Sequence, residues 1–494
     1  MNLTMVLDMA ADGPDDRILV GSRNDGLTAR ELRDAALSGA GLVTDSGATS
    51  VIHLAANGPA FPVALFAAAT AGVPFVPLNY RLGTGQLRTL VQHHAGALII
   101  ADDRHAPLLP PEAAHTYTPR TWLEATASRP MPEQEQITGA EDPAVIIYTS
   151  GTTSAPKGVL LRHDNLVSYV IGGAEFASAD PDDAALMCVP PYHIAAVSNV
   201  LTNIYAGRRL VILDTFSPDR WLKLVCAERV TNAMVVPTML ARLMDEPDSE
   251  RAVATLRTLA YGGAAMPPRV IEQALRAWPD VGFVNAYGLT ETSSTVSVLG
   301  PEDHRAAFAA EDPEGRARLH SAGRPIPGVE IEIRCADGRP VAPGMSGRVW
   351  VRGAQVSGKY AGVASEAGDG WFDTRDLGRL DTEGFLFVLG REDDTIIRGA
   401  ENIAPAEIED VLLRQPGVAD AVVVGVPDEE WGQRIEAVVV PVRGTSLDGE
   451  ELRAEIRRRL RGSKTPDRIA VWDEIPRTAT GKVLRRDIST ELSR

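Results

Sequence analysis

The sequence predicts an α/β protein built from two unequal parts. The larger is an N-terminal domain of mostly parallel sheets flanked by helices plus a β-rich subdomain, and the smaller is an α+β C-terminal domain. Three observations predict this class. Short apolar runs alternate with helical stretches up to residue 292. Gly, Pro, Val and charged residues then alternate closely from residue 322, and a shorter helix and strand pattern returns beyond residue 400.

The first part of the chain predicts short buried strands separated by helices. Strand-like apolar runs lie at residues 50–54, 73–77 and 97–101. Residues 58–71 form an Ala-rich apolar stretch, which predicts a helix that ends at Gly72. Residues 107–143 are rich in Pro, Glu and Thr, so we expect a surface connection there.

Glycine turns follow three strands of the predicted sheets. The expected helix is 162–172, and the expected strands are 209–213, 233–237, 259–266 and 281–292. Turns with glycine and hydroxyl residues lie at 149–158, 262–264 and 285–292. Since ligands gather beyond the carboxyl ends of strands in open α/β sheets, these turns are predicted to be walls of one pocket.

The pattern of residue types changes in the last third of the chain. Residues 323–351 and 371–389 predict the hairpins of a β-rich subdomain. Residues 390–400 are polar and flanked by glycine, which is a linker composition. Beyond them we expect helices at 405–413 and 452–460 and strands at 419–426 and 435–442. A turn-prone loop near the end presents Lys482.

Composition excludes several classes of function. The chain has 494 residues, 44% of them hydrophobic and 23% charged, as in soluble globular proteins. Its net charge of −17 argues against nucleic-acid binding. The three cysteines are too far apart for a metal pair or a disulfide framework, which fits a reducing, cytoplasmic location. Neither a signal peptide nor an apolar run of the roughly 18 residues that a membrane span needs is evident.

Residues 148–159, which read YTSGTTSAPKGV, predict a loop that wraps phosphates. The hydroxyl residues are Thr149, Ser150, Thr152 and Thr153, with Gly151 among them. Hydroxyls and exposed backbone N–H groups can face an anion, and Lys157 adds a positive charge. The pattern is not a P-loop, because Lys157 precedes its glycine. An ordinary flexible loop is the alternative, which the tight order SGTT-x-x-PKG disfavours.

Five motifs in order resemble those of the adenylate-forming superfamily of acyl- and aryl-CoA synthetases, peptide-synthetase adenylation domains and luciferases. They are YTSGTTSAPKG (148–158), NAYGLTET (285–292), DTRDLG (373–378), GREDDTIIRGAENIAPAEIE (390–409) and PRTATGK (476–482). The resemblance covers nearly the whole chain. It implies an N-terminal AMP- and acyl-binding domain at 1–391 and a mobile C-terminal domain at 392–494, with a hinge near Asp393.

The resemblance also implies a two-step reaction that uses ATP, Mg²⁺ and coenzyme A. A carboxylate attacks the α-phosphorus of ATP to give an acyl-adenylate and pyrophosphate, and a thiol then displaces AMP. Negative charge grows between two anions in the first step, so cations and oriented donors must screen it. The implied partners are a small carboxylic acid and CoA, with a homodimer left open.

The nucleotide residues are carried over from the motifs. Thr149, Ser150, Gly151, Thr152, Thr153 and Lys157 would hold the phosphates, and Gly262, Gly263, Ala264, Asn285, Ala286, Tyr287 and Gly288 would surround the adenine, with Tyr287 stacked on it. Thr290 would contact the α-phosphate, and Glu291, with Thr152, would hold Mg²⁺. Asp376, assisted by Arg391, would bind the ribose hydroxyls. The alternative for Glu291 is a helix N-terminal acid, which is compatible with a role in Mg²⁺ binding. On their own, Asp376 and Arg391 would more often be a surface acid and base.

Lys482 is the expected catalytic cation of adenylation, since a lysine on a mobile lobe can bridge the substrate carboxylate and the α-phosphate. Its alternative is a solvated surface lysine. Gly399 and Ala400 would line the tunnel for the pantetheine arm of CoA. The family usually has glycine where this chain has Ser154 and often where it has Ala400, which could affect loop closure and the tunnel.

The acyl pocket is placed by resemblance alone. His193 would be a gate near the acyl and thiol sites, although a lone histidine is more often satisfied within a core. Ser198, Asn199, Pro237 and Gly263 would contact the acid. Small and apolar residues favour a neutral tail or ring, hence a medium-chain or aromatic monocarboxylic acid. Asn199 could recognise a polar substituent.

Two other functions stay open. The enzyme could stand alone and pass its acyl-AMP to a carrier-protein thiol or an amine, because no carrier domain follows Arg494. It could also be a nucleotide-binding regulator without turnover, which the joint presence of Lys482, Glu291 and Asp376 disfavours.

Overall fold

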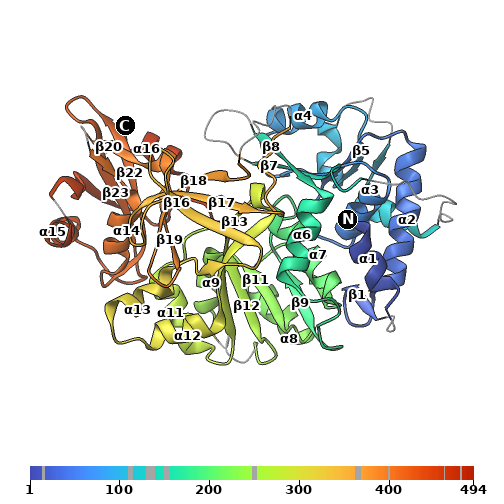
Figure 1. Ribbon diagram of the computed structural model, residues 1–494, viewed down its shortest axis with the longest axis horizontal. Helices are drawn as coiled ribbons and strands as arrows, with labels where there is room; N and C mark the ends of the chain where they lie inside the picture. Colours follow the sequence, from blue (N-terminus) through green and yellow to red (C-terminus); the bar gives the residue numbers. More distant parts are fainter. Residues whose placement is uncertain are drawn as a thin grey trace.

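The protein has a large N-terminal lobe (α1 to β19) and a small C-terminal lobe (β20 to α16) at one end of it (Figure 1). The computed structural model describes residues 1–13, 17–109, 115–128, 139–149, 156–247, 253–361, 369–398, 401–460, 462–478 and 481–493. The predicted fold class is confirmed, with mostly parallel sheets in the large lobe.

Two large sheets form the body of the N-terminal lobe. The first has nine strands in the order β15 (Arg324–Pro325), β14 (Ser294–Leu299), β13 (Gly282–Leu289), β12 (Thr258–Gly262), β11 (Asn232–Val235), β9 (Ala184–Met187), β10 (Arg209–Ile212), β1 (Ile18–Gly21) and β2 (Gly26–Thr28). The second has six, in the order β6 (Thr116–Tyr117), β5 (Leu98–Ala101), β3 (Val51–Leu54), β4 (Phe75–Pro77), β7 (Pro143–Thr149) and β8 (Lys157–Arg162).

Helices cover these sheets. They are α1 (Thr4–Ala11), α2 (Ala29–Asp45), α3 (Ala60–Thr70), α4 (Thr84–His93), α5 (Pro119–Ser128), α6 (His163–Gly173), α7 (Ile194–Tyr205), α8 (Pro218–Ala227), α9 (Pro237–Met244), α11 (Pro268–Ala277), α12 (Pro301–Ala309) and α13 (Pro313–Ala317). The predicted helix at 58–71 is α3, which is apolar all round because it is buried on every side. None of the described helices is long and apolar enough to span a membrane.

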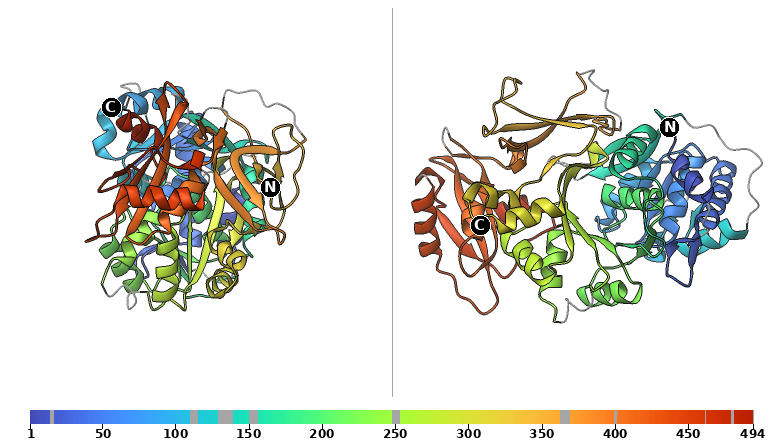
Figure 2. Two further views of the ribbon diagram at one scale, coloured as in Figure 1. Left: turned by 90° about the vertical axis from the view of Figure 1, so that its left-hand side faces the viewer. Right: turned by 60° about the horizontal axis from the view of Figure 1, so that its bottom comes forward.

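The β-rich subdomain is a four-stranded antiparallel sheet that stands out from the body in Figure 2. Its strands are β16 (Val329–Arg334), β17 (Gly347–Gly353), β18 (Phe372–Leu380) and β19 (Leu386–Arg391). The hairpins predicted from the alternating sequence are therefore confirmed. The sheet carries residues 376 and 391 opposite each other on β18 and β19.

The C-terminal lobe has its own core. Its elements are β20 (Ile396–Arg398), β21 (Glu401–Ile403), α14 (Pro405–Leu413), β22 (Val418–Asp428), β23 (Gly432–Pro441), α15 (Gly449–Arg459), β24 (Arg468–Val471) and α16 (Arg485–Leu492). Side chains of β22 alternate between two faces, so Val423 packs in the cluster of α14 and α15 while Val422 and Val424 pack with α16.

Two predictions about local structure are corrected. Residues 107–143 are more than a surface connection: they include β6 and α5, and Trp122 of α5 is fully buried against Tyr117 at 5.6 Å between ring centroids. The linker at 390–400 also contains a short 3₁₀ turn, Glu392–Asp394, and the strand β20.

Candidate active site

A buried carboxylate, Asp376 of β18, lies where the nine-stranded sheet meets the four-stranded sheet. Tyr287 of β13 donates its hydroxyl hydrogen to Asp376 Oδ2 at 2.5 Å. Arg391 Nη1 lies 3.2 Å from Asp376 Oδ1, and the Asp376 side chain is only 7% exposed. Both carboxylate oxygens therefore have charged or polar partners, which a buried ion requires.

The electrostatics of Asp376 connect three distant motifs. Burial raises the pKa of Asp376, while Arg391, the Tyr287 hydroxyl and Lys482 act to lower it, and Glu291 acts to raise it. Lys482 belongs to the C-terminal lobe, and Glu291 lies in the 3₁₀ turn that follows β13. Both charges therefore lie near enough to Asp376 to act on its carboxylate.

Glu291 is fixed by a tyrosine that the sequence did not single out. Tyr360 donates its hydroxyl hydrogen to Glu291 Oε1 at 2.8 Å, and Ser357 N donates to Glu291 O at 2.8 Å. Burial, then the charge of Glu291, raise the pKa of Tyr360, so its hydroxyl stays protonated as a donor. Lys157 Nζ lies 5.9 Å from the centroid of the Tyr360 ring. This contact brings the end of the predicted phosphate loop towards Glu291.

The glycine turns allow close approach of two backbones. A Cβ on Gly262 would lie 2.3 Å from Ala286 O, so any larger residue would separate β12 from β13. Gly263 has φ of +82°, a conformation that favours glycine. A Cβ on Gly288 would lie 1.8 Å from Ser294 O. Glycine at this position therefore lets β13 approach and pair with β14.

The other residues predicted to bind the nucleotide lie at strand ends or in the turns that follow them. Asn285 donates its side-chain amide to Ser321 O at 2.9 Å, a contact that supports the sheet. Thr290 and Glu291 lie in the 3₁₀ turn Thr290–Thr292 that follows β13. Ala264 follows Gly263 beyond the end of β12. Thr149 lies at the end of β7, and its hydroxyl donates to Lys157 O at 3.4 Å.

Lys482 is carried by a turn that contacts the N-terminal lobe. Lys482 N donates to Thr478 Oγ1 at 3.1 Å, and Thr478 N donates to Lys482 O at 2.8 Å. A Cβ on Gly481 would lie 3.4 Å from Thr238 Oγ1, so the turn rests against the start of α9. Arg477 and Thr478 line a cavity of about 310 Å³ together with residues of the N-terminal lobe, including Thr238.

The predicted acyl-pocket residues lie just before or on α7, at the start of α9 and, for Gly263, beyond the end of β12. His193 precedes α7, 4.8 Å from Tyr192 between ring centroids, and burial lowers its pKa to about 4, so its ring is neutral near pH 7. Ser198 Oγ lies 3.3 Å from Ser294 Oγ, which joins α7 to β14. Pro237 is the first residue of α9.

Ion pairs flank the predicted hinge residue, Asp393, on both sides. Arg348 of β17 lies 2.6 Å from Glu392 Oε1 through Nη2. On the other side, Arg485 Nε of α16 lies 3.4 Å from Asp394 Oδ2. Glu392 is thus tied to the N-terminal lobe and Asp394 to the C-terminal lobe.

Some predicted residues lie outside the described part of the chain. They are Ser150, Gly151, Thr152, Thr153, Gly399 and Ala400, together with the departure at Ser154. Among the residues that are described, no group of three or more His, Cys, Asp or Glu side chains could hold a metal ion.

Two residues of the site were missed by sequence reasoning. Tyr360 is 69 residues from Glu291, and no local pattern predicted their contact. Arg477 stands inside a recognised motif, but its pairing with Asp420 joins positions 57 residues apart. The motif itself could have drawn attention to Arg477.

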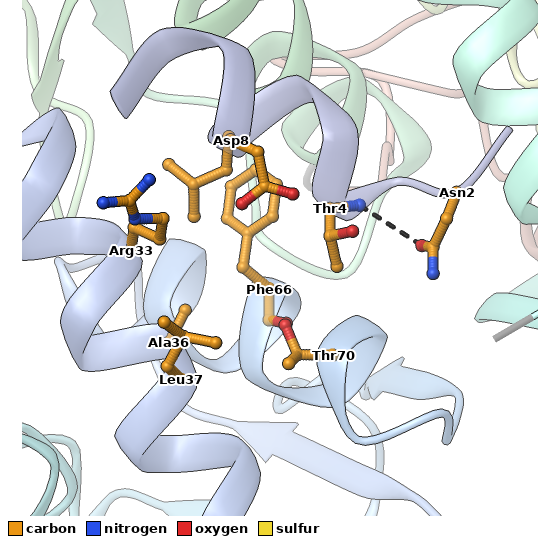
Figure 3. A pocket seen from close by; sticks show the side chains of 9 residues that line it. Asn2, Thr4, Asp8, Arg33, Ala36, Leu37, Phe66 and Thr70 are labelled. Atoms are coloured by element: carbon orange, nitrogen blue, oxygen red, sulfur yellow. Dashed lines mark hydrogen bonds between the residues drawn. The ribbon is translucent and has the colours of Figure 1, made fainter. Parts of the chain in front are cut away.

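A second pocket, between α1, α2 and α3, is shown in Figure 3. It is lined by residues such as Thr4, Asp8, Arg33 and Phe66 and encloses about 30 Å³. This space holds at most one or two waters. It lies near the N-terminus in Figure 1, away from the lobe that carries Lys482.

The C-terminal turn that carries Lys482 rests against Thr238 of the N-terminal lobe, and the buried Asp376 belongs to that same lobe. Comparison with known families gives the class of the protein. A profile described as "AMP-binding enzyme" matches residues 7–361, and one described as "AMP-binding enzyme C-terminal domain" matches residues 407–482. The chain therefore belongs to the AMP-binding enzyme family, the adenylate-forming superfamily indicated by its motifs. It is an acid–thiol ligase of the AMP-forming type.

Individual relatives and structures are consistent with this assignment. The chain is 35% identical over 446 residues to a feruloyl-CoA synthase from Amycolatopsis sp, covering 89% of this chain and 88% of that protein. It is 33% identical over 464 residues to an indoleacetate–CoA ligase from Aromatoleum aromaticum, covering 90% and 88%.

Two solved structures cover almost all of this chain. ATP-bound MatB from Rhodopseudomonas palustris has a TM-score of 0.88 at 25% identity, covering 100% of this chain and 99% of that one. The amide bond synthetase McbA from Marinactinospora thermotolerans has a TM-score of 0.85 at 26% identity, covering 99% of each chain.

Proposed function

We propose that the protein is an ATP- and Mg²⁺-dependent acid–CoA ligase, which forms an acyl-adenylate and then transfers the acyl group to CoA. The observation that carries the proposal is that the turn carrying Lys482 rests against Thr238 of the N-terminal lobe, and that Arg477 and Thr478 of this turn line a cavity together with residues of that lobe. A lysine delivered there could stabilise an anionic intermediate that forms between the lobes.

The nucleotide would be held by groups already in place. Asp376 would accept hydrogen bonds from the ribose hydroxyls, with Arg391 and Tyr287 fixing its orientation. The adenine would lie against the Gly262–Gly263 turn at the end of β12. Thr149 and Lys157, with the hydroxyl residues between them, would surround the phosphates.

Mg²⁺ fits the donors of this site. It prefers hard oxygen ligands and often takes one or two protein carboxylates plus phosphate oxygens. Glu291 offers one such carboxylate, held by Tyr360, and Thr152 is the second proposed ligand. When bound, Mg²⁺ would neutralise phosphate charge.

In the first step, a carboxylate oxygen of the acid forms a bond to the α-phosphorus of ATP, and the bond from that phosphorus to the bridging oxygen of pyrophosphate breaks. Lys482 would stabilise the charge shared by the two reacting anions. In the second step, the sulfur of CoA bonds to the acyl carbon, the thiol proton is lost, and AMP leaves. Rotation of residues 392–494 about Asp393 would remove Lys482 and bring Gly399 and Ala400 to the pantetheine arm.

We propose an aromatic or medium-chain monocarboxylic acid as the substrate. Arg208, a donor only, bonds to Asn203 Oδ1 at 3.0 Å, so the Asn203 amide nitrogen donates to Asn199 Oδ1 at 3.0 Å. Asn199 then has its own amide nitrogen left to donate, which favours an acid with an oxygen substituent. A neutral His193 adds no charge to this pocket. Relatives named for feruloyl-CoA and indoleacetate support an aromatic acid.

An acceptor other than CoA is the second candidate, favoured by the likeness to an amide bond synthetase. A panel of acids with ATP, scored for pyrophosphate with and without CoA and for the CoA thioester by mass spectrometry, tests both. Thioester formation supports the proposal. Pyrophosphate that appears only with an amine or a carrier thiol would support the alternative, and no pyrophosphate with any acid would favour a regulator.

We also propose a cytoplasmic location, which the three free cysteines support. A homodimer is to be tested by light scattering.

A further inference from the structure

The turn that carries Lys482 is joined to the C-terminal sheet by one guanidinium group. Arg477 Nη2 lies 2.9 Å from Asp420 Oδ1 and 2.8 Å from Asp420 Oδ2, while Arg477 Nη1 donates to Gly481 O at 2.8 Å. Asp420 lies on β22, at a shift in its register with β23. The Arg477 and Asp420 side chains are only 19% and 26% exposed.

This contact differs from the other bonds described for the turn. Thr478 and Lys482 bond to each other, and Gly481 N donates to Thr478 O at 2.9 Å, so these bonds close the turn on itself. Arg477 instead links the carbonyl immediately before Lys482 to a strand of the lobe's core. Gly481, the residue that accepts this bond, also rests against Thr238 of the N-terminal lobe.

We propose that Arg477, held by Asp420, is a positioning residue that fixes the backbone of Lys482 for the adenylation step. The proposal rests on the proposed role of Lys482. A lysine side chain is long and flexible, so the place of its ammonium depends on where its backbone is held. An error of about 1 Å in the placement of a reacting group can cost about 100-fold in rate. Arginine suits this task because its rigid planar fork reaches a carboxylate and a carbonyl together, whereas a lysine ammonium is a compact point charge on a flexible stem.

The test compares the two half-reactions in Arg477→Met and Asp420→Asn. In both variants we expect kcat for pyrophosphate release to fall about 10- to 100-fold. We expect KM for ATP and the rate of thioester formation from synthetic acyl-adenylate to change by less than about threefold, since neither uses the placement of Lys482. Arg477→Lys should recover part of the rate.

Controls separate positioning from folding. Asp420→Asn keeps the size of the side chain, so it serves if Arg477→Met fails to fold. Arg453 of α15 also joins a carbonyl, Pro466 O at 2.9 Å, to a carboxylate, that of Glu450. This contact does not involve the turn that carries Lys482. Arg453→Met should therefore leave pyrophosphate release unchanged. The double variant Arg477→Met/Asp420→Asn should be no slower than Arg477→Met alone, because Arg477→Met already removes the contact that Asp420→Asn removes.

Three results would overturn the inference: unchanged pyrophosphate release in Asp420→Asn and Arg477→Met, an equal loss in both half-reactions, or additive effects in the double variant. The wild-type protein and Lys482→Ala are assayed alongside. Absence of adenylation in the wild type, or full activity of Lys482→Ala, would instead count against the proposed function.

Discussion

The nucleotide side and the lysine side of the site are built in opposite ways. Tyr287 and Arg391 each contact a carboxylate oxygen of Asp376 at the junction of two sheets, so this part is in place before any ligand arrives. Lys482 is exposed, and it reaches the site on a turn from a separate lobe. On the proposed function, the rigid part would bind the nucleotide in both steps, whereas a cation needed in only one of the two steps would have to be removable.

Removal of the Lys482 ammonium should have the largest effect on the rate. We expect Lys482→Ala to lower pyrophosphate release by about 1,000-fold, comparable to the loss of a key stabilising donor in other active sites. Thioester formation from synthetic acyl-adenylate should be largely spared. Equal loss in both assays would show that the lysine is not specific to one step.

Disruption of the rigid frame should have a somewhat smaller effect and a different signature. Asp376→Asn removes the charge that Arg391 pairs with and leaves that guanidinium poorly compensated, at a cost of about 1.5–3 kcal/mol. We expect a rise in KM for ATP of about 10- to 100-fold. Asp373→Asn, on the same strand but paired with Arg348, is the matched control. A pure kcat effect would contradict a binding role.

Restricting the proposed hinge should affect the two half-reactions differently. Asp393→Pro limits the backbone rotation proposed for this residue, because proline fixes φ. Thioester formation should fall by about tenfold or more while pyrophosphate release changes little, on the view that a hinge residue must absorb the change in backbone angles. Stopped-flow assays of each half-reaction would measure this. A parallel fall in both rates would place the hinge elsewhere.

The last prediction concerns the pH dependence of stability: we expect acid to lower the free energy of unfolding of the N-terminal lobe before that of the C-terminal lobe. All nine histidines lie between His53 and His320, so the C-terminal lobe has none. His53 is fully buried between Phe61 and Phe75, and burial lowers its pKa to about 3. Below pH 6.5 the unfolded chain therefore holds a proton that the folded lobe does not, and stability falls as pH falls from 6.5 towards 3.

For one such histidine the loss is about 1.4 kcal/mol per pH unit in that window. Calorimetry from pH 7 to pH 5 should show the N-terminal lobe losing stability first, and His53→Leu should reduce the slope. An acid transition that begins in the C-terminal lobe would contradict this expectation.

Sequence reasoning succeeded where the signal was local. The helix predicted at 405–413 is α14, since a proline start and an apolar face are visible within nine residues. It failed at α5, because the burial of Trp122 depends on packing against α2 and α3, far away in sequence. The motifs named Asp376, Glu291 and Lys482, whereas Tyr360 and the partner of Arg477 come from folding contacts that no spacing encodes.

The ion pairs on either side of Asp393 have a mechanical consequence. Glu392 can travel with Arg348 and Asp394 with Arg485, so neither pair needs to break when the lobes reorient. On the proposed rotation, the torsional change would then fall on Asp393 alone. A twist of that one backbone would carry the C-terminal lobe as a single body, and Lys482 with it, away from Asp376.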